Sequence, residues 1–362
     1  MENWMDSTLL TLGSEFDEVL IHSSRIYRVL INAGRKRVPR KETGQMRKWM
    51  STYLSSPYND HPARFFSFPR KAPQAAVLEE KPFMDGTQKL YAFPSGYKVR
   101  NPDFREYFQS FEQNRTAYLY HWRHGDRCRK TILCCHGWSL GDPGQAERMF
   151  RIQKLYKMGL DVALFITPFH HRRAASLAER FSPPFPFQHP VLGLEGFGQS
   201  MYDLGSSFLL LKQLGASRMG AIGASLGGYL VALFVSLSRM AELAALVVPL
   251  VSFQNLRLPT SVLAGGMGNG KGKGAFEQEI SALWKIHSPL SMSLKLDPER
   301  CLLIASKGDR LCPFQDVQRL YEHWGNPRHL FLQGGHALFF PRSARGAAWY
   351  GFLQEHGFVG SK

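Results

Sequence analysis

The sequence predicts an α/β fold in which a mostly parallel, twisted sheet carries helices on both faces. Two observations predict it. From about residue 86, short apolar runs of the kind found in buried parallel strands alternate with longer stretches of helical periodicity. The chain has 362 residues, of which 44% are apolar and 20% charged, so it can bury a sizeable core. Strands that alternate with helices over this length favour parallel βαβ units.

The expected strands are short, and from the third onward they are almost wholly apolar. They occupy residues 89–97, 116–123, 130–135, 161–167, 220–222, 245–248, 302–305 and 329–332. Apolar residues at helical spacing predict the helices that lie between them. These helices occupy residues 145–155, 198–214, 226–237, 314–324 and 344–355.

Two segments interrupt the alternation within the main domain, which we expect at residues 86–362. Residues 169–196 are rich in Pro and Phe, and residues 253–296 contain a glycine-rich loop at 265–274. Each segment follows the carboxyl end of a strand, where open α/β sheets bind their ligands. We therefore expect both to form a cap or lid over a site.

Residues 1–85 are predicted to form a basic, helical extension. Ser14, with Asp17 three residues later, has the pattern of a capping box and predicts a helix that Gly34 ends. A basic run follows at residues 35–41. A second helix is predicted by five residues at helical spacing, Met46, Trp49, Met50, Tyr53 and Leu54. We expect these helices to dock on the main domain, with pairing to a second subunit or contact with a membrane as the alternatives.

The formal net charge is +16, which favours anionic partners without naming one. We expect no nucleic acid partner, because the basic run at residues 35–41 lacks interleaved aromatic residues and no DNA-reading motif is present. A weak peripheral contact with an anionic membrane surface and assembly into a homo-oligomer both stay open.

The sequence also favours a cytoplasmic location. No apolar run approaches the about 20 residues that a membrane-spanning helix needs, and the first residues do not have the pattern of a signal peptide. The five cysteines show no metal-binding spacing. Cys134, Cys135 and Cys301 lie in or beside apolar strands and are expected to be buried thiols, which suits a reducing compartment.

The sharpest local signal is Gly223-Ala224-Ser225-Leu226-Gly227. It follows a short strand and opens a uniformly apolar helix, the context in which such a turn exposes a nucleophilic serine. Only small residues fit two positions before and after the serine, here Gly223 and Gly227. The alternative is a glycine-rich turn in which Ser225 merely caps the helix.

A serine is a weak nucleophile at neutral pH and needs a base within hydrogen-bonding reach. Asp309 comes just after one expected strand, and His336 follows the last strand in a Gly-Gly-His loop. Competing residues are few. No Asp or Glu closely follows the strand at residues 245–248, His329 opens the last strand, and His356 lies in the last helix. The sequence therefore predicts that Asp309 and His336 are the partners of the serine.

With these motifs the sequence resembles the α/β-hydrolase superfamily over roughly residues 88–358. The matching motifs, in chain order, are His136-Gly137-Trp138, Gly223–Gly227, Gly308-Asp309 and Gly334-Gly335-His336. The resemblance is closest to the esterase, dienelactone-hydrolase and acyl-peptidase-like branches. It implies an acyl-enzyme mechanism without a metal or other cofactor. Ser225 would be the nucleophile, His336 the general base and Asp309 the acid that orients the base.

The resemblance also implies an oxyanion hole. In this fold the loop after the strand at residues 131–135 supplies one backbone N–H, here that of Trp138, and the residue after the nucleophile, Leu226, supplies the other. The ring of His136, beside Gly137, is expected to be structural. The loop is not the longer glycine-rich type of many lipases, and residues 167–173 are not the usual segment at their position. These departures leave the subfamily and the substrate open.

His170, His171, Arg172 and Arg173 follow the strand at residues 161–167, near the expected mouth of the site. Arginine side chains bind anionic groups in a bidentate manner, so these four residues are candidates for substrate binding. A solvent-facing basic loop without a ligand is the alternative.

The function that these patterns predict is hydrolysis of a carboxylic ester. Amide hydrolysis, peptidase activity and acyl transfer at the same triad are the close alternatives, and a catalytically silent binding protein on this fold is the distant one. The expected substrate is a small or lipid-like acyl compound, and the net charge with Arg172 and Arg173 near the mouth favours one that carries a negative group. Its apolar part would meet apolar residues in and next to the first lid segment, Phe181, Phe185, Phe187, Leu192 and Phe197.

Overall fold

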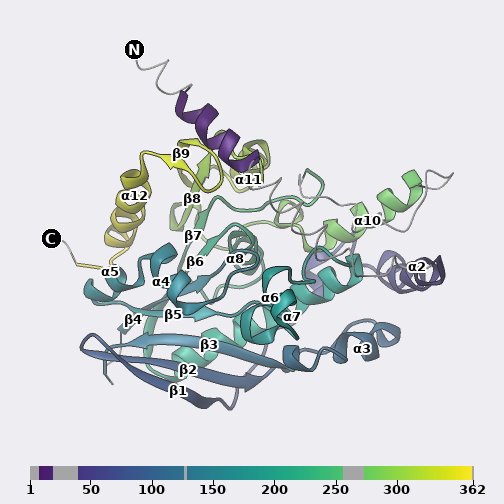
Figure 1. Cartoon of the computed structure of the whole chain (residues 1–362), viewed down its shortest axis with the longest axis horizontal. Helices are drawn as coiled ribbons and strands as arrows, with labels where there is room; N and C mark the ends of the chain where they lie inside the picture. The colour runs from purple at the N-terminus through teal and green to yellow at the C-terminus, as the bar shows by residue number, and fades with distance from the viewer. Residues whose placement is uncertain (1–7, 19–39, 126–128, 256–272, 361–362) are drawn as a thin grey trace.

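A mixed sheet of ten strands runs through the computed structural model, which describes residues 8–18, 40–125, 129–255 and 273–360 (Figure 1). The strand order is β1-β2-β3-β5-β4-β6-β7-β8-β9-β10. The six strands from β5 to β9 in this order are mutually parallel, and β1, β2, β3 and β10 pair antiparallel at the two edges. The strands are β1 (Ala76–Phe83), β2 (Gly86–Pro94), β3 (Thr116–Arg123), β4 (Arg129–Cys135), β5 (Asp161–Phe165), β6 (Ala216–Ala224), β7 (Leu243–Val247), β8 (Cys301–Ser306), β9 (Arg328–Gly334) and β10 (Phe339–Phe340).

Helices connect the parallel strands and cover both faces of the sheet (Figure 1). The α-helices with described bounds are α2 (Arg40–Leu54), α3 (Pro102–Gln109), α4 (Pro143–Phe150), α5 (Ile152–Lys157), α6 (Leu177–Phe181), α7 (Pro190–Gln213), α8 (Leu226–Leu237), α10 (Lys273–His287), α11 (Phe314–His323) and α12 (Arg342–Glu355). Residues 8–18 are helical as well. Short 3-10 turns lie at Pro62–Phe65, Glu112–Arg115, His171–Arg173, Pro289–Ser291 and Pro298–Arg300.

The core divides into one apolar layer on each face of the sheet. Helices α2, α3, α7, α8, α10 and α11 contribute to one layer, and α4, α5 and α12 contribute to the other. Within β4, Leu133 and Cys135 point into the first layer, while Ile132 and Cys134 point into the second. Both faces of the parallel strands are therefore covered, which explains their nearly continuous apolar sequences. The predicted α/β fold with a mostly parallel sheet is confirmed.

Three elements differ from the expectation. The sheet begins at β1, ten residues before the expected start of the main domain. Residues of β1 are mostly exposed, Val77 and Leu78 included, and its sequence lacks the alternation of apolar and polar residues that predicts a half-buried strand. The helix expected at 145–155 is split into α4 and α5 at Arg151, whose backbone has a φ of 53°. Ser14 lies inside the helical segment 8–18 and not at its start, so the capping box predicted there is wrong.

Helix α2 docks on the main domain as the sequence predicts. Met50 and Tyr53 are fully buried, and the hydroxyl of Tyr53 donates to the carboxylate of Glu195 on α7. Glu195 also accepts the hydroxyl of Tyr97 (2.6 Å) and the backbone N–H of Arg100 (3.0 Å). A buried carboxylate with several donors therefore fixes the extension to the body of the protein.

Some expectations lie outside the described residues. These are the end of the first helix at Gly34, most of the basic run at 35–41, most of the glycine-rich loop at 265–274, and Cys128. Cys134, Cys135 and Cys301 are buried and free, as expected. Over the part of the chain that is described, no helix combines the length and apolar character that crossing a membrane requires.

Candidate active site

Ser225 lies at the sharp turn between β6 and α8. Its backbone has φ 55° and ψ −117°, a conformation that costs a non-glycine residue about 1–3 kcal/mol and persists only where its surroundings impose it. Here the N–H of Ser225 donates to the carbonyl of Val247 (3.0 Å), and the carbonyl of Ser225 accepts the N–H of Leu250 (3.1 Å). The turn thus holds Ser225 at the carboxyl edge of the sheet, where the N-terminus of α8 favours negative charge.

Two glycines make this turn sterically feasible. A Cβ on Gly223 would lie 2.1 Å from the carbonyl oxygen of Gly227, and a Cβ on Gly227 would lie 1.9 Å from the carbonyl oxygen of Cys135. Cβ atoms do not approach other atoms that closely. The turn packs so closely on its own backbone that it requires Gly223, and the close passage of β4 requires Gly227.

The loop of residues 136–138 follows β4 and lies against the turn, because a Cβ on Gly137 would be 3.5 Å from the Cβ of Ser225. His136 is buried, with Nδ1 2.8 Å from the carbonyl oxygen of Gly137 and Nε2 3.1 Å from the backbone nitrogen of Thr167. Burial lowers the pKa of His136 to about 4, so the ring is neutral, donates through Nδ1 and accepts through Nε2. The ring therefore ties this loop to the end of β5.

The two expected oxyanion donors belong to the segments that meet at Ser225. Leu226 is the first residue of α8, so its N–H has no acceptor within the helix. Trp138 directly follows Gly137 in the loop beside the serine, and its indole packs edge-on against Phe187 at a centroid distance of 5.6 Å.

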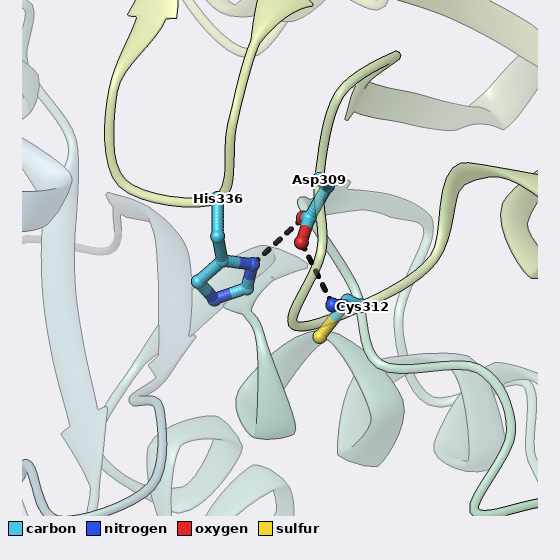
Figure 2. Close-up of side chains that lie close together, drawn as sticks. All are labelled: Asp309, Cys312 and His336. Carbon is cyan, nitrogen blue, oxygen red and sulfur yellow. Dashed lines mark hydrogen bonds and ion pairs between the residues drawn. The ribbon is translucent and has the colours of Figure 1, made fainter. Parts of the chain in front are cut away.

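Asp309 and His336 meet at the carboxyl ends of β8 and β9 (Figure 2). Nδ1 of His336 lies 2.7 Å from Oδ2 of Asp309. The other oxygen of Asp309 accepts the backbone N–H groups of Leu311 (3.0 Å) and Cys312 (2.7 Å). The carboxylate is buried and bound through both oxygens, so it holds the imidazole in one orientation with Nδ1 protonated.

Two opposing effects act on the imidazole of His336. Burial by itself lowers the pKa of His336, but the carboxylate of Asp309, with a smaller contribution from Cys312, outweighs it and holds the pKa well above its ordinary value. A histidine in this environment accepts a proton readily, as a general base for a serine must.

Sequence reasoning gave no role to Cys312, which lies next to His336. Its sulfur lies within 4.8 Å of a ring nitrogen of His336 and of a carboxylate oxygen of Asp309. Burial raises the pKa of the Cys312 thiol, which therefore stays protonated at neutral pH and is a poor nucleophile. Sequence position alone does not identify this residue, because it follows Asp309 in a loop without a recognisable motif.

Sequence reasoning also missed Asp17. Its carboxylate accepts the backbone N–H of His336 at 2.8 and 2.7 Å. The two residues are 319 positions apart, so no local pattern could have related them.

The basic loop after β5 does not have the form that the sequence predicts. Arg173 is buried, and its guanidinium donates to the carboxylate of Asp203 (2.8 Å) and to the carbonyl oxygen of Asn114 (2.9 Å). His170 is also buried, with Nδ1 2.8 Å from the carbonyl oxygen of Pro168. The expectation that Arg173 and His170 face a substrate is therefore wrong, because both side chains belong to the packed interior.

The other two residues of this loop are more accessible. The guanidinium of Arg172 donates to the carboxylate of Glu79 on β1 and to the hydroxyl of Tyr120 on β3 (2.9 Å). His171 is half-buried and has a φ of 48°. Arg172 thus already has an anionic partner from the edge of the sheet.

Aromatic side chains of the two expected lid segments meet beside the loop that carries Trp138. The ring centroid of Phe187, from residues 169–196, lies 5.7 Å from that of Phe253, the first residue of the second segment. The ring centroid of Phe253 in turn lies 5.9 Å from that of Trp284 on α10. The two segments therefore pack against each other and against the oxyanion loop through an apolar surface.

Comparison with known proteins gives relatives at low identity, and no family model matches the chain. The uncharacterized proteins MT2702 and Rv2627c, from two strains of Mycobacterium tuberculosis, are each 25% identical over 329 residues, which is 90% of this chain and 77% of theirs. Among solved structures, an acetyl xylan esterase from Paenibacillus sp. R4 is similar with a TM-score of 0.53 at 13% identity, over 84% of this chain and 93% of that one.

A second solved structure of an acetyl xylan esterase is similar to the chain to the same extent. Acetyl xylan esterase 1 from Thermoanaerobacterium sp. JW/SL YS485 is similar with a TM-score of 0.53 at 12% identity, over 82% of this chain and 92% of that one. The order of the strands, the turn at Ser225 and these two likenesses together lead to one conclusion. The chain has the α/β-hydrolase fold.

Proposed function

We propose that the chain is a serine hydrolase that cleaves a carboxylic ester through an acyl-enzyme intermediate. Ser225 is the nucleophile, His336 is the general base, and Asp309 orients and stabilises the base. The observation that carries the proposal is the 2.7 Å contact between His336 Nδ1 and Asp309 Oδ2, at the same carboxyl edge of the sheet as a serine held in a strained strand-to-helix turn.

In the first step the hydroxyl of Ser225 attacks the ester carbonyl carbon while Nε2 of His336 takes the hydroxyl proton. The carbonyl oxygen gains negative charge, which the backbone N–H groups of Leu226 and Trp138 stabilise. The tetrahedral intermediate collapses, His336 gives its proton to the leaving alcohol, and the acyl group stays on Ser225. In the second step His336 activates a water molecule that releases the acid.

The side chains beside the oxyanion loop support an apolar acyl group as the substrate part that enters the protein. Trp138, Phe187 and Phe253 form a continuous cluster of aromatic rings there. The structures that share the fold include acetyl xylan esterases, so short acyl groups are the first to test. A small or lipid-like ester therefore fits the proposal better than an anionic substrate, because Arg173 is in the core and Arg172 is paired.

The proposal is tested with p-nitrophenyl esters of acetate, butyrate and octanoate beside the matching p-nitroanilides. We expect hydrolysis of the esters, little hydrolysis of the anilides, and loss of ester activity in Ser225→Ala. The matched control is Ser236→Ala on the same helix, whose hydroxyl donates only to the carbonyl oxygen of Ala232 (2.9 Å) and which should keep full activity.

Other outcomes point elsewhere. Anilide hydrolysis that equals ester hydrolysis would favour an amidase or peptidase, and transfer of the acyl group to an added alcohol would favour an acyltransferase. Ester hydrolysis that survives in Ser225→Ala would overturn the proposal.

A further inference from the structure

The helical segment 8–18 lies against the two loops that carry Asp309 and His336. Figure 1 shows this segment, in dark purple, beside β9 and α11 at the edge of the sheet opposite β1. Its contacts join residues about 290 to 320 positions apart in the sequence. The segment is therefore part of the wall of the candidate active site.

Asp17 makes the most specific of these contacts. Both of its carboxylate oxygens accept the backbone N–H of His336, at 2.8 and 2.7 Å, and one of them also accepts the backbone N–H of Arg310 (3.0 Å). Arg310 directly follows Asp309. The carboxylate of Asp17 thus binds the main chain of His336, the proposed base, and of the residue that follows Asp309, the acid that orients this base.

Close backbone packing surrounds this carboxylate. A Cβ on Gly13 would lie 2.1 Å from the backbone nitrogen of Gly335, and a Cβ on Gly335 would lie 2.2 Å from the carbonyl oxygen of Gly13. The hydroxyl of Ser14 donates to the carbonyl oxygen of Gly308 (2.9 Å). The segment therefore touches both catalytic loops at van der Waals distance, and neither loop can shift without displacing it.

The side chain of Asp17 is fully buried, and its partners are backbone N–H groups of the two loops. Burying a carboxylate costs free energy unless hydrogen bonds compensate for it. Charge-assisted hydrogen bonds to backbone N–H groups are about twice as strong as neutral ones. The cost is therefore offset only while both loops keep their present positions.

We propose that Asp17 is a positioning residue of the triad: it fixes the main chain of His336 and Arg310, and thereby holds the base and the acid in register with Ser225. This inference rests on the proposed function. It assigns to the N-terminal segment a role in turnover that neither the sequence nor the fold family requires.

The central test is Asp17→Asn, compared with the wild type in ester kinetics. The amide keeps the shape of the carboxylate but presents an N–H₂ group to N–H donors and removes the charge. We expect kcat to fall about 10- to 100-fold, the size of effect that a misplacement of about 1 Å produces, while KM stays within about twofold. The control is Glu15→Gln, which removes the same charge from an exposed position on the same segment and should leave both constants unchanged.

The pH profile separates positioning from a purely structural role. His336 is faced by Asp309 and Cys312 from one loop and by Asp17 from the helical segment. Loss of the charge on Asp17 should therefore move the midpoint of the rising limb of kcat/KM to lower pH. Glu15→Gln should not move it.

Ser14→Ala perturbs the same contact between the helical segment and the catalytic loops more mildly than Asp17→Asn, because it removes one hydrogen bond and no buried charge. We expect a several-fold loss of kcat with a circular dichroism spectrum equal to that of the wild type. Unchanged kcat in folded Asp17→Asn and Ser14→Ala, with activity still abolished in Ser225→Ala, would overturn the positioning role and leave the proposed function standing. Activity that survives in Ser225→Ala would instead reject the proposed function.

Discussion

Oδ2 of Asp309 lies 2.7 Å from Nδ1 of His336, while Oδ1 of the same carboxylate accepts the N–H groups of Leu311 and Cys312. The carboxylate therefore has no freedom to rotate away from the imidazole. Its position depends on the backbone of its own loop, and the orientation of the imidazole depends on the carboxylate.

Asp309→Asn should lower kcat by about 10⁴-fold, the loss known for the equivalent change in serine proteases. The amide has one oxygen, which can serve either the backbone N–H groups or the imidazole but not both. The ring would lose its orientation and the partner for its positive charge. Steady-state kinetics on the p-nitrophenyl esters measure the effect, with the circular dichroism spectrum as a check of the fold. A loss of less than tenfold would mean that another residue orients the base.

The pH dependence of kcat/KM should report His336. Asp309 holds the pKa of His336 well above its ordinary value, and the base must be neutral to accept a proton. Activity should therefore rise with pH, with a midpoint above the unperturbed value of about 6.5. In Asp309→Asn the largest effect that raises the pKa of the ring is gone while burial still lowers it, so the midpoint should move down. A profile that is flat from pH 5 to pH 9 would contradict a histidine base.

Arg173→Met should reduce the free energy of unfolding by about 3–5 kcal/mol, because Asp203 would be left buried without its partner. Arg172→Met is the matched control, and its partly exposed pair with Glu79 should contribute only about 0–1 kcal/mol. Urea denaturation of both variants measures the difference. Equal stabilities, together with a raised KM for anionic esters, would instead favour the substrate-binding role that the sequence suggested.

The parts of the fold that could be predicted from the sequence are those that local patterns determine. The parallel strands are apolar because both faces are covered, and the turn at Ser225 has its glycines because its own backbone and β4 pass within contact distance. Asp309 and His336 could be predicted because each follows a strand whose carboxyl end is on the same edge of the sheet. These relationships depend on short segments and on the order of the strands.

The residues whose roles the sequence did not predict are positioned by contacts between segments that are far apart in the chain. Ser14 and Asp17 resemble a capping box, but their side chains bind loops about 300 positions away. Arg173 follows a strand in a basic stretch, but its side chain is buried in the core, where it pairs with Asp203 on α7. Cys312 lies close to His336 only in the folded structure, because the loop that carries Cys312 packs against this histidine. In each case the partner is set by tertiary packing, of which the local sequence carries no trace.

The most direct test of the central claim is covalent labelling by a fluorophosphonate, followed by mass spectrometry of the digested protein. The probe reacts with a serine whose hydroxyl a neighbouring base activates, and in the proposed function this serine is Ser225, at the start of α8. We predict one phosphonylated residue, Ser225, and no label in Ser225→Ala. The absence of label in the folded wild-type protein, or label on another residue such as Cys312, would contradict the account.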